Sequence, residues 1–406
     1  MSIGEPIANE ISPVETDRPD AREVAPLRRD DFDRDVWCLM GLAVDAADIT
    51  RAVAEVDNAV RNRKQLSFVT PNVNFLIRAS KDAAARREIL NADLSLIDGA
   101  PLVMMAKLLG VPVRSRVAGS DLFDALRRRP GYAGRRVKVF FFGGRDGSAE
   151  AAFDALNREN GGVEAVGWFN PGFGDVESMS TDTVIDQINA CEPDFVLVAL
   201  GAAKGQSWIE RNRERLTAPV TAHLGAVVDF AAGSVARAPQ WMQRVGLEWV
   251  WRILEEPSLW RRYFDDGLAL FALAARRLAP QFPRAGAITG KVETTLETAP
   301  DRTIVKISGQ AGVNSLKSIR EAFRAAAARG KDVRLDLAAA EAVDRAFLGL
   351  VLMLEKHLNR AGAEISLSGA RPAVDSLFRA NLMNYAQAGE GDLSAQQIPA
   401  ARRAAG

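Results

Sequence analysis

Two apolar runs of this chain end in polar side chains that could act on a substrate. The first run is followed by Thr70 and Asn72, and the second by Asp98. A carboxylate could take a proton from a substrate hydroxyl, while the hydroxyl and amide groups could position that substrate. Arg116, in the next predicted loop, could bind an anionic group. Residues of these types also form ordinary turns, so their spacing alone leaves a turn and a site equally open.

Both runs are typical of buried strands, because each is short, apolar and followed by a helical pattern. Open α/β sheets bind ligands at the carboxyl ends of their strands, which is where the polar residues lie. Further apolar runs alternate with helical patterns in the same way, over residues 136–142, 163–168, 195–200 and 220–224. This alternation predicts an α/β fold with a Rossmann-like, largely parallel sheet that helices cover on both faces.

A glycine turn follows the phenylalanine-rich strand of that sheet. Gly143 and Gly144 precede a helix that begins near Ser148, whose hydroxyl we expect to cap it. A strand, a glycine turn and a helix N-terminus together can receive phosphate on backbone amides. The spacing departs from GxGxxG, so a plain strand-to-helix turn remains the alternative.

The composition excludes several classes of protein. Lys and Arg total 52, as do Asp and Glu, so no net field favours nucleic acid. The two cysteines and two histidines are too few for a disulfide framework, a zinc site, a histidine-rich metal site or a Ser-His-Asp triad. The first residues lack the pattern of a signal peptide, and no apolar stretch reaches the roughly 18 residues that span a bilayer. We therefore expect a cytoplasmic protein without a metal or cofactor, with His357 exposed on a helix.

The pattern of the chain predicts two domains. Residues 1–33 are expected to form a disordered arm in which Asp31-Phe32-Asp33 is a solvated charge run, and residues 389–406 a frayed tail. The expected parts between them are a larger domain at 34–279, a linker at 280–290 and a small α/β domain at 291–388. The small domain shows no cluster of nucleophile, base and metal ligand.

Residues 237–279 of the larger domain are rich in tryptophan and arginine. Four of the seven tryptophans lie within about 20 residues there, interleaved with arginines. One interpretation is a helical segment at a membrane surface, with aromatic rings at the headgroups and cations toward anionic lipid. A second is a lid that brings arginines to a diphosphate. A third is a helical hairpin that packs its tryptophans on the domain.

Residues of about 36–265 resemble the WecG/TagA/CpsF glycosyltransferases, which form glycosyltransferase family twenty-six. The matching pieces are Thr70-Pro71-Asn72, Asp98-Gly99, Arg116 with Gly119-Ser120-Asp121, Gly143-Gly144, Asp229-Phe230 with Gly233, Arg237-Ala238-Pro239, and Glu248-Trp249, Arg252, Glu256-Pro257 and Arg262-Tyr263. The resemblance implies a fold of the GT-E type. It also implies inverting, metal-independent transfer of a hexosyl or N-acetylhexosaminyl group from a UDP-sugar to an undecaprenyl-diphosphate-linked acceptor, in surface or exopolysaccharide biosynthesis. Such an enzyme would associate peripherally with the inner face of the cytoplasmic membrane.

The resemblance also gives roles to individual residues. It implies that Asp98 is the general base and that Thr70 belongs with it in the catalytic site. The residues expected to bind substrate are Asn72, Arg116, Gly143, Gly144, Lys204, Gln206, Asp229, Arg237, Arg252 and Arg262. The family usually has Gly-x-Pro-Lys-Gln-Glu where this chain has Gly201-Ala202-Ala203-Lys204-Gly205-Gln206. This departure favours an alternative function, a catalytically weak regulator that binds a nucleotide sugar.

Residues of about 290–388 resemble a STAS domain, the fold of anti-sigma-factor antagonists. The resemblance rests on residues 333–337 and on the segment from Ala342 to Leu350. Where that family often has a phosphorylatable serine, this chain has Ala346, which argues against a phosphorylation switch there. The resemblance implies a docking or regulatory module with a protein partner. A protein whose function depends mainly on such docking is a second alternative.

Overall fold

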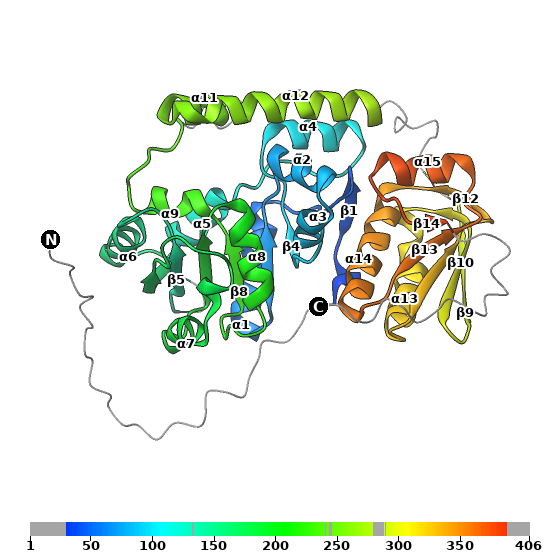
Figure 1. Cartoon of the computed structure of the whole chain (residues 1–406), viewed down its shortest axis with the longest axis horizontal. Coiled ribbons are helices and arrows are strands. Elements are labelled where there is room, and N and C mark those ends of the chain that lie inside the picture. Colours follow the sequence, from blue (N-terminus) through cyan, green and yellow to red (C-terminus); the bar gives the residue numbers. More distant parts are fainter. Residues whose placement is uncertain are drawn as a thin grey trace, which may run out of the picture.

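The computed structural model of the chain describes residues 30–131, 134–239, 241–242, 246–278, 288 and 290–387. The predicted tail, nearly all of the predicted arm and most of the predicted linker lie outside these residues. Two α/β units lie beside each other, and a two-stranded hairpin stands between them (Figure 1).

The larger unit is built on a six-stranded sheet with the strand order β4-β3-β8-β7-β5-β6. Its strands are β3 (Leu66–Val69), β4 (Leu94–Ser95), β5 (Val137–Gly143), β6 (Val163–Phe169), β7 (Phe195–Ala199) and β8 (Val220–His223). All neighbouring strands are parallel. β5 and β7 are largely apolar and almost wholly buried, because helices cover both faces of the sheet. The predicted Rossmann-like parallel sheet is confirmed.

Helices alternate with these strands, as the sequence predicts. They are α1 (Ile49–Asn62), α2 (Val73–Lys81), α3 (Ala83–Leu90), α4 (Ala100–Leu108), α5 (Gly119–Arg128), α6 (Ser148–Arg158), α7 (Asp182–Ala190), α8 (Ala202–Asn212) and α9 (Gly225–Ala231). One local prediction is wrong. Gly147, not Ser148, caps α6, because the Ser148 hydroxyl donates to the Arg145 carbonyl at 2.9 Å. Residues Ala202 to Gln206 form the first turns of α8, with Gly201 at its N-terminus.

Two further helices, α11 (Glu248–Glu255) and α12 (Trp260–Arg277), run along the top of the larger unit in Figure 1, where α12 lies above α2 and α4. α12 is fixed to α2 by the Asn74 amide, which donates to the Asp266 carboxylate at 3.1 Å. The two helices run end to end and do not fold back as a hairpin. Trp241, Trp249 and Trp260 remain exposed, so the third interpretation, a hairpin with packed tryptophans, is wrong. Among the described helices, none combines the length and the apolar character needed to cross a bilayer.

The smaller unit has a six-stranded mixed sheet with helices packed on it. Its strands are β9 (Val292–Thr298), β10 (Arg302–Ala311), β11 (Asp332–Asp336), β12 (Ala340–Val343), β13 (Ile365–Ser368) and β14 (Ala386–Gln387). Its helices are α13 (Leu316–Ala327), α14 (Arg345–Ala361) and α15 (Pro372–Ala380). β9 runs antiparallel to β10, and the other pairs are parallel. The small α/β domain predicted from the sequence is therefore confirmed as a fold.

The hairpin between the units consists of β1 (Val36–Leu39) and β2 (Leu42–Asp45), preceded by the short helix η1 (Asp31–Asp33). The prediction that residues 31–33 form a solvated charge run is wrong. Asp31 and Phe32 are buried, because Asp31 accepts hydrogen bonds from Arg34 and from Lys356 of α14. His357, predicted to be exposed, stacks on the Phe32 ring with 4.7 Å between ring centroids.

Candidate active site

The predicted site residues Thr70, Asn72 and Asp98 lie at one edge of the larger sheet. β3 and β4 are parallel neighbours, so their carboxyl ends meet there. The Asp98 backbone N–H donates to the Pro71 carbonyl at 2.9 Å, which ties the two strand ends together. Asn72 caps α2 by accepting the Phe75 N–H at 3.3 Å, so it has a structural role as well. The structure thus brings Thr70, Asn72 and Asp98 to the carboxyl ends of two neighbouring strands.

The turn after Asp98 depends on a glycine. Gly99 has a φ of 107°, a region that L side chains rarely adopt, and it precedes α4 with Pro101 in its first turn. The chain can therefore leave β4 sharply. The Asp98 side chain stays at the sheet edge with 28% of its surface exposed.

Asp98 has an unusual protonation equilibrium. Burial raises the pKa of its carboxyl to about 7, and the negative charges of Glu248 and Asp121 add to the increase. Arg116 opposes this shift from 3.6 Å, the distance between its Nη1 and Asp98 Oδ1. A carboxyl with a pKa near 7 is ionised in a large fraction of molecules at neutral pH and can still hold a proton. It therefore suits a general base.

Arg116 lies between three carboxylates. Its guanidinium is 2.8 Å from Glu248, 3.4 Å from Asp121 and 3.6 Å from Asp98. Glu248 belongs to α11, so the tryptophan- and arginine-rich segment contributes directly to this site. Neither Glu248 nor Asp121 was among the predicted site residues, although both lie in the motif pieces that carry the family resemblance.

Arg237 and Arg252 both contact the aromatic ring of Phe230. Their guanidinium carbons are 5.7 Å and 5.6 Å from the centre of the Phe230 ring. Arg237 is also bound by Asp121 at 2.5 Å and by Asp124 at 2.6 Å. The protein's own carboxylates thus engage Arg237, whereas Arg252 faces a pocket.

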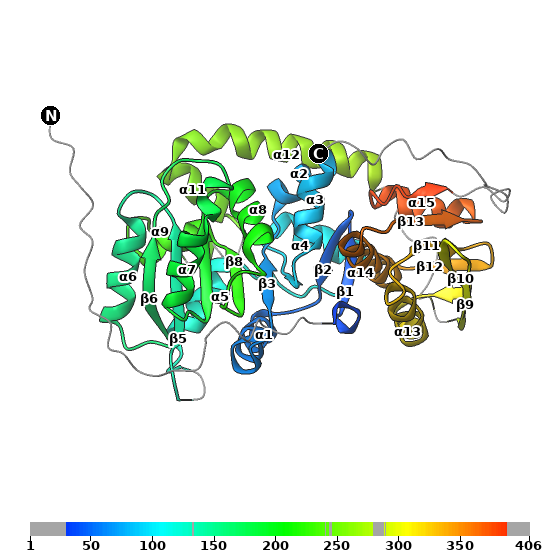
Figure 2. The ribbon, with the colours of Figure 1, turned by 60° about the horizontal axis from the view of Figure 1, so that its bottom comes forward.

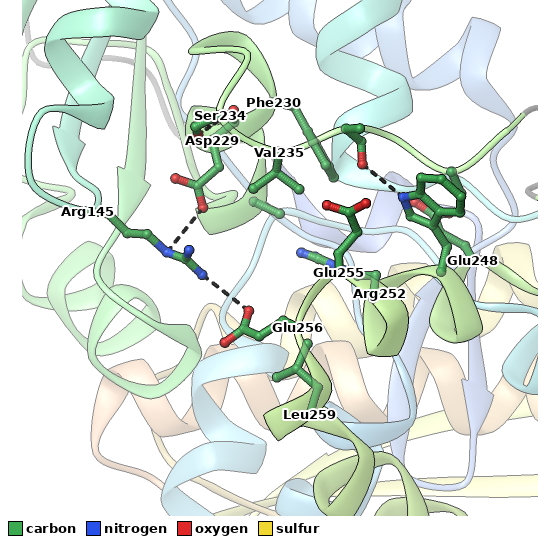
Figure 3. A pocket seen from close by; sticks show the side chains of 14 residues that line it. Arg145, Asp229, Phe230, Ser234, Val235, Glu248, Arg252, Glu255, Glu256 and Leu259 are labelled. Carbon is green, nitrogen blue, oxygen red and sulfur yellow. Dashed lines mark hydrogen bonds and ion pairs between the residues drawn. The ribbon is translucent and has the colours of Figure 1, made fainter.

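That pocket, of about 200 Å³, lies between α9 and α11 (Figure 3). Arg252, Glu248 and Asp229 line it, and Arg145 bridges Asp229 at 3.8 Å and Glu256 at 3.2 Å. Burial raises the pKa of Asp229, and the charges of Arg145 and Arg252 oppose the shift. The pocket is smaller than whole ligand sites, which usually measure roughly 300–1,000 Å³. Arg145, from the glycine turn, is a further site residue that the prediction missed.

The glycine pair has a packing role. A Cβ on Gly143 would lie 2.7 Å from the Leu200 side chain, and one on Gly144 would lie 2.7 Å from the Ser148 hydroxyl oxygen. Both glycines therefore let β5 pass close to the end of β7 and the start of α6. The turn places Arg145 at the pocket (Figure 3).

Three predicted residues lie apart from this cluster. Lys204 donates to the Gly174 carbonyl at 2.7 Å, across the exposed loop beside α8. Gln206 is only 2% exposed and packs against α3, where its amide donates to the Glu88 carbonyl at 3.4 Å. Arg262 is exposed on α12, 5.2 Å above the Tyr263 ring.

The chain matches the description "Glycosyl transferase WecG/TagA/CpsF family" over residues 37–283, which is more than half of its length. The chain belongs to this family. It is a glycosyltransferase, as the resemblance implied. Residues 294–384 match the description "Mlab, STAS domain", so the smaller unit is a STAS domain.

Curated relatives of this glycosyltransferase share one name, N-acetylglucosaminyldiphosphoundecaprenol N-acetyl-beta-D-mannosaminyltransferase. The Bacillus spizizenii relative is 31% identical over 217 residues, which cover 53% of this chain and 82% of the relative. The Bacillus subtilis relative is 30% identical, with 48% of this chain and 73% of the relative covered. A Staphylococcus aureus relative is 25% identical, with 55% and 85% covered.

Among solved structures, the anti-sigma factor antagonist SpoIIAA in its unphosphorylated form is similar to part of the chain. The identity is 16%, and the match covers 24% of this chain and 88% of that one, with a TM-score of 0.22. A similarity at this level carries no information about function.

Proposed function

We propose that this glycosyltransferase moves a sugar from a UDP-sugar to an undecaprenyl-diphosphate-linked acceptor, with Asp98 as general base. The observation that carries the proposal is the Asp98 carboxyl, whose pKa of about 7 is set at a strand end beside Arg116. The names of the relatives support the acceptor, because each specifies N-acetylglucosaminyldiphosphoundecaprenol. They also favour an N-acetylhexosamine as the transferred sugar.

The chemistry follows from these groups. Ionised Asp98 takes the proton of the acceptor hydroxyl, whose oxygen forms a bond to the sugar C1 from the face opposite the leaving diphosphate. The bond between C1 and the diphosphate oxygen breaks, and UDP leaves with the bonding electrons. The configuration at C1 is inverted. Asp98 then loses its proton to solvent.

The leaving diphosphate develops negative charge that must be stabilised. Arg252 lines the pocket and Arg145 lies at its opposite wall, so both can approach the phosphates (Figure 3). Arg116 is bound by carboxylates on three sides, and we assign it mainly to holding Asp98, Glu248 and α11 in place.

A membrane surface is the natural place for an acceptor with a polyprenyl chain, and α12 fits that surface. Trp260, Phe264, Leu268 and Phe271 are spaced along one face of α12 and are between 51% and 72% exposed. Met104 and Leu108 of α4 are exposed as well. An amphipathic helix with aromatic residues on one face and arginines beside them is typical of a helix that lies in the headgroup region. We therefore propose peripheral association through α12, at the inner face of the cytoplasmic membrane.

The test of this function is transfer by wild type and by Asp98→Asn. UDP release and product formation should be measured with UDP-N-acetylhexosamines and an N-acetylglucosaminyl diphosphate on a short polyprenyl chain. We expect turnover by wild type and a loss of about 10²–10⁴-fold in the variant, the usual contribution of a general base. Full activity of Asp98→Asn would refute the role of Asp98.

A second candidate function is a regulator that binds a nucleotide sugar without turnover. It is favoured by the altered segment in α8, where Gln206 is buried and a Cβ on Gly205 would lie 2.1 Å from the His223 ring. Lys204 of that segment donates to the Gly174 carbonyl at 2.7 Å, apart from the pocket. Tight binding of a UDP-sugar by wild type with no product on any acceptor tested would select this candidate.

A further inference from the structure

The STAS domain joins the transferase domain through its longest helix. Most of α14 is buried, and its side runs along β1 in both views (Figure 1, Figure 2). A Cβ on Gly349 would lie 2.1 Å from the Val36 carbonyl oxygen, so the backbones of α14 and β1 are in direct contact. Phe32, Val36 and Cys38 belong to the same apolar core as the STAS helices and strands. The two domains therefore share one core.

A buried network of charges crosses this interface at Lys356. Its ammonium, which is wholly buried, lies 2.7 Å from Asp31 and 3.3 Å from Asp93 and donates to the Ala92 carbonyl at 2.9 Å. Burial lowers the pKa of Lys356 to about 8, against the two aspartates. Burial alone would raise the pKa of Asp31, but Lys356 and Arg34 hold it below its ordinary value. The network is thus ionic.

Side chains of this network and its neighbours bind backbone groups at and beside β4, the end strand of the larger sheet. β4 is at the end of the sheet order, so only β3 pairs with it. Two residues before β4, the Ala92 carbonyl accepts from Lys356 and from Arg34 Nη1 at 3.0 Å. The Ser95 N–H donates to Asp45 at 2.7 Å, and Asp45 is bound by Arg34 at 2.7 Å. Side chains thus satisfy backbone groups that an edge strand would otherwise leave open.

β4 leads directly to Asp98. Only two residues, Leu96 and Ile97, separate Ser95, the end of the strand, from Asp98. Position matters at this scale, because a displacement of about 1 Å at a reacting group can cost about a hundredfold in rate. We propose that Lys356 of the STAS domain is a positioning residue for Asp98, which it holds through the outer edge of β4. The STAS domain is then a structural part of the transferase, because its helix α14 packs against β1 of the same chain.

This inference rests on the proposed role of Asp98, and its test has two independent measurements. The variant is Lys356→Met, which leaves Asp31 bound to Arg34 and Asp93 bound to Arg213 at 2.6 Å. Because that change unbalances buried charge, Lys356→Met with Asp31→Asn serves as a second, charge-balanced variant. The matched control is Glu355→Gln, the adjacent residue of α14. Its carboxylate accepts from Arg86 of α3 across the same interface at 2.9 Å and from the Tyr385 hydroxyl at 2.6 Å.

The first measurement is steady-state transfer as a function of pH. We expect both Lys356 variants to lower kcat at least tenfold with little change in KM and to shift the acidic limb of the pH profile. That limb reflects the pKa of Asp98, on which the charged groups Arg116, Glu248, Asp121 and Arg252 act. We expect Glu355→Gln to stay within about twofold of wild type, because its partners Arg86 and Tyr385 lie outside the segment 92–98. Equal losses in all variants, or an unshifted limb and wild-type kcat in the Lys356 variants, would overturn the inference.

The second measurement, amide hydrogen exchange, does not need turnover. We expect residues 92–98 to exchange faster in the Lys356 variants than in wild type and Glu355→Gln. Unchanged protection of that segment in both Lys356 variants would overturn the inference. Absence of transfer by wild type would instead refute the proposed function and leave the exchange result to decide whether Lys356 holds β4.

Discussion

Replacing Asp98 with asparagine should stabilise the protein at alkaline pH while it removes the catalytic base. In the folded state burial raises the pKa of Asp98 from 3.8 to about 7. Between these values the folded protein holds the proton more tightly than the unfolded chain does. The stability contribution of this group is therefore fully present below about pH 4 and is lost as pH rises through 7. Asparagine carries no charge and avoids that loss.

The magnitude follows from the same shift. A shift from 3.8 to about 7 corresponds to a cost of about 4 kcal/mol at pH 8, where both states are ionised. Water reaches the 28% of the side chain that is exposed and screens the charge, so we expect a gain of about 2 kcal/mol in the variant. At pH 4.5 the gain should fall to about a quarter of its value at pH 8, because the unfolded carboxyl is then only partly ionised.

Urea unfolding at pH 8 and pH 4.5 measures this directly, as the difference between variant and wild type at each pH. The matched control is Asp124→Asn, which removes a carboxylate that binds Arg237 at 2.6 Å. The control should lose about 1 kcal/mol at pH 8, since it breaks an ion pair. The reasoning would be refuted if Asp98→Asn were less stable than wild type at pH 8. It would also be refuted if the difference in free energy of unfolding between variant and wild type were the same at both pH values.

Three further outcomes are expected. Arg116→Gln should lower kcat about a hundredfold. It should also move the acidic limb of the pH–rate profile to higher pH, because the guanidinium that lowers the pKa of Asp98 is gone. An acidic limb at the wild-type pH would contradict this. The double variant Phe264→Ala and Phe271→Ala should weaken partition onto vesicles with anionic lipid at least tenfold, since each exposed aromatic side chain contributes about 1.5–3 kcal/mol when it is buried. Unchanged partition would exclude α12 as the membrane-binding helix. Gly205→Ala should lower the free energy of unfolding by about 1–3 kcal/mol, because its Cβ would lie 2.1 Å from the His223 ring; wild-type stability in thermal unfolding would show that the ring can move.

The sequence predicted the parts of the site that are local. Thr70 and Asp98 could be found because each ends an apolar strand, and parallel strands bring such ends to one edge. The contact of Arg116 with Glu248 could not be found in this way, because it joins a loop to a helix more than a hundred residues later. The resemblance placed both residues in the family pattern but gave no distance between them.

Predictions failed where tertiary packing decides the environment. Gln206 was predicted to bind substrate, but α8 begins at Ala202 and turns that side chain toward α3, where it is buried. Asp31 was assigned to a solvated arm because charged runs usually are solvated. Its partner Lys356 is 325 residues away, and no local pattern indicates that such a pair is buried.

The shared core also constrains how the chain folds during synthesis. The β1–β2 hairpin and Leu90 emerge from the ribosome early, whereas the STAS residues that bury them, as far as Phe378, emerge last. At about 5–20 residues per second, the interval between Leu90 and Phe378 lasts roughly 15–60 s. Throughout that time Val36, Cys38 and the outer edge of β4 have no partner from α14. We therefore expect the nascent transferase domain to expose apolar surface until α14 has been made.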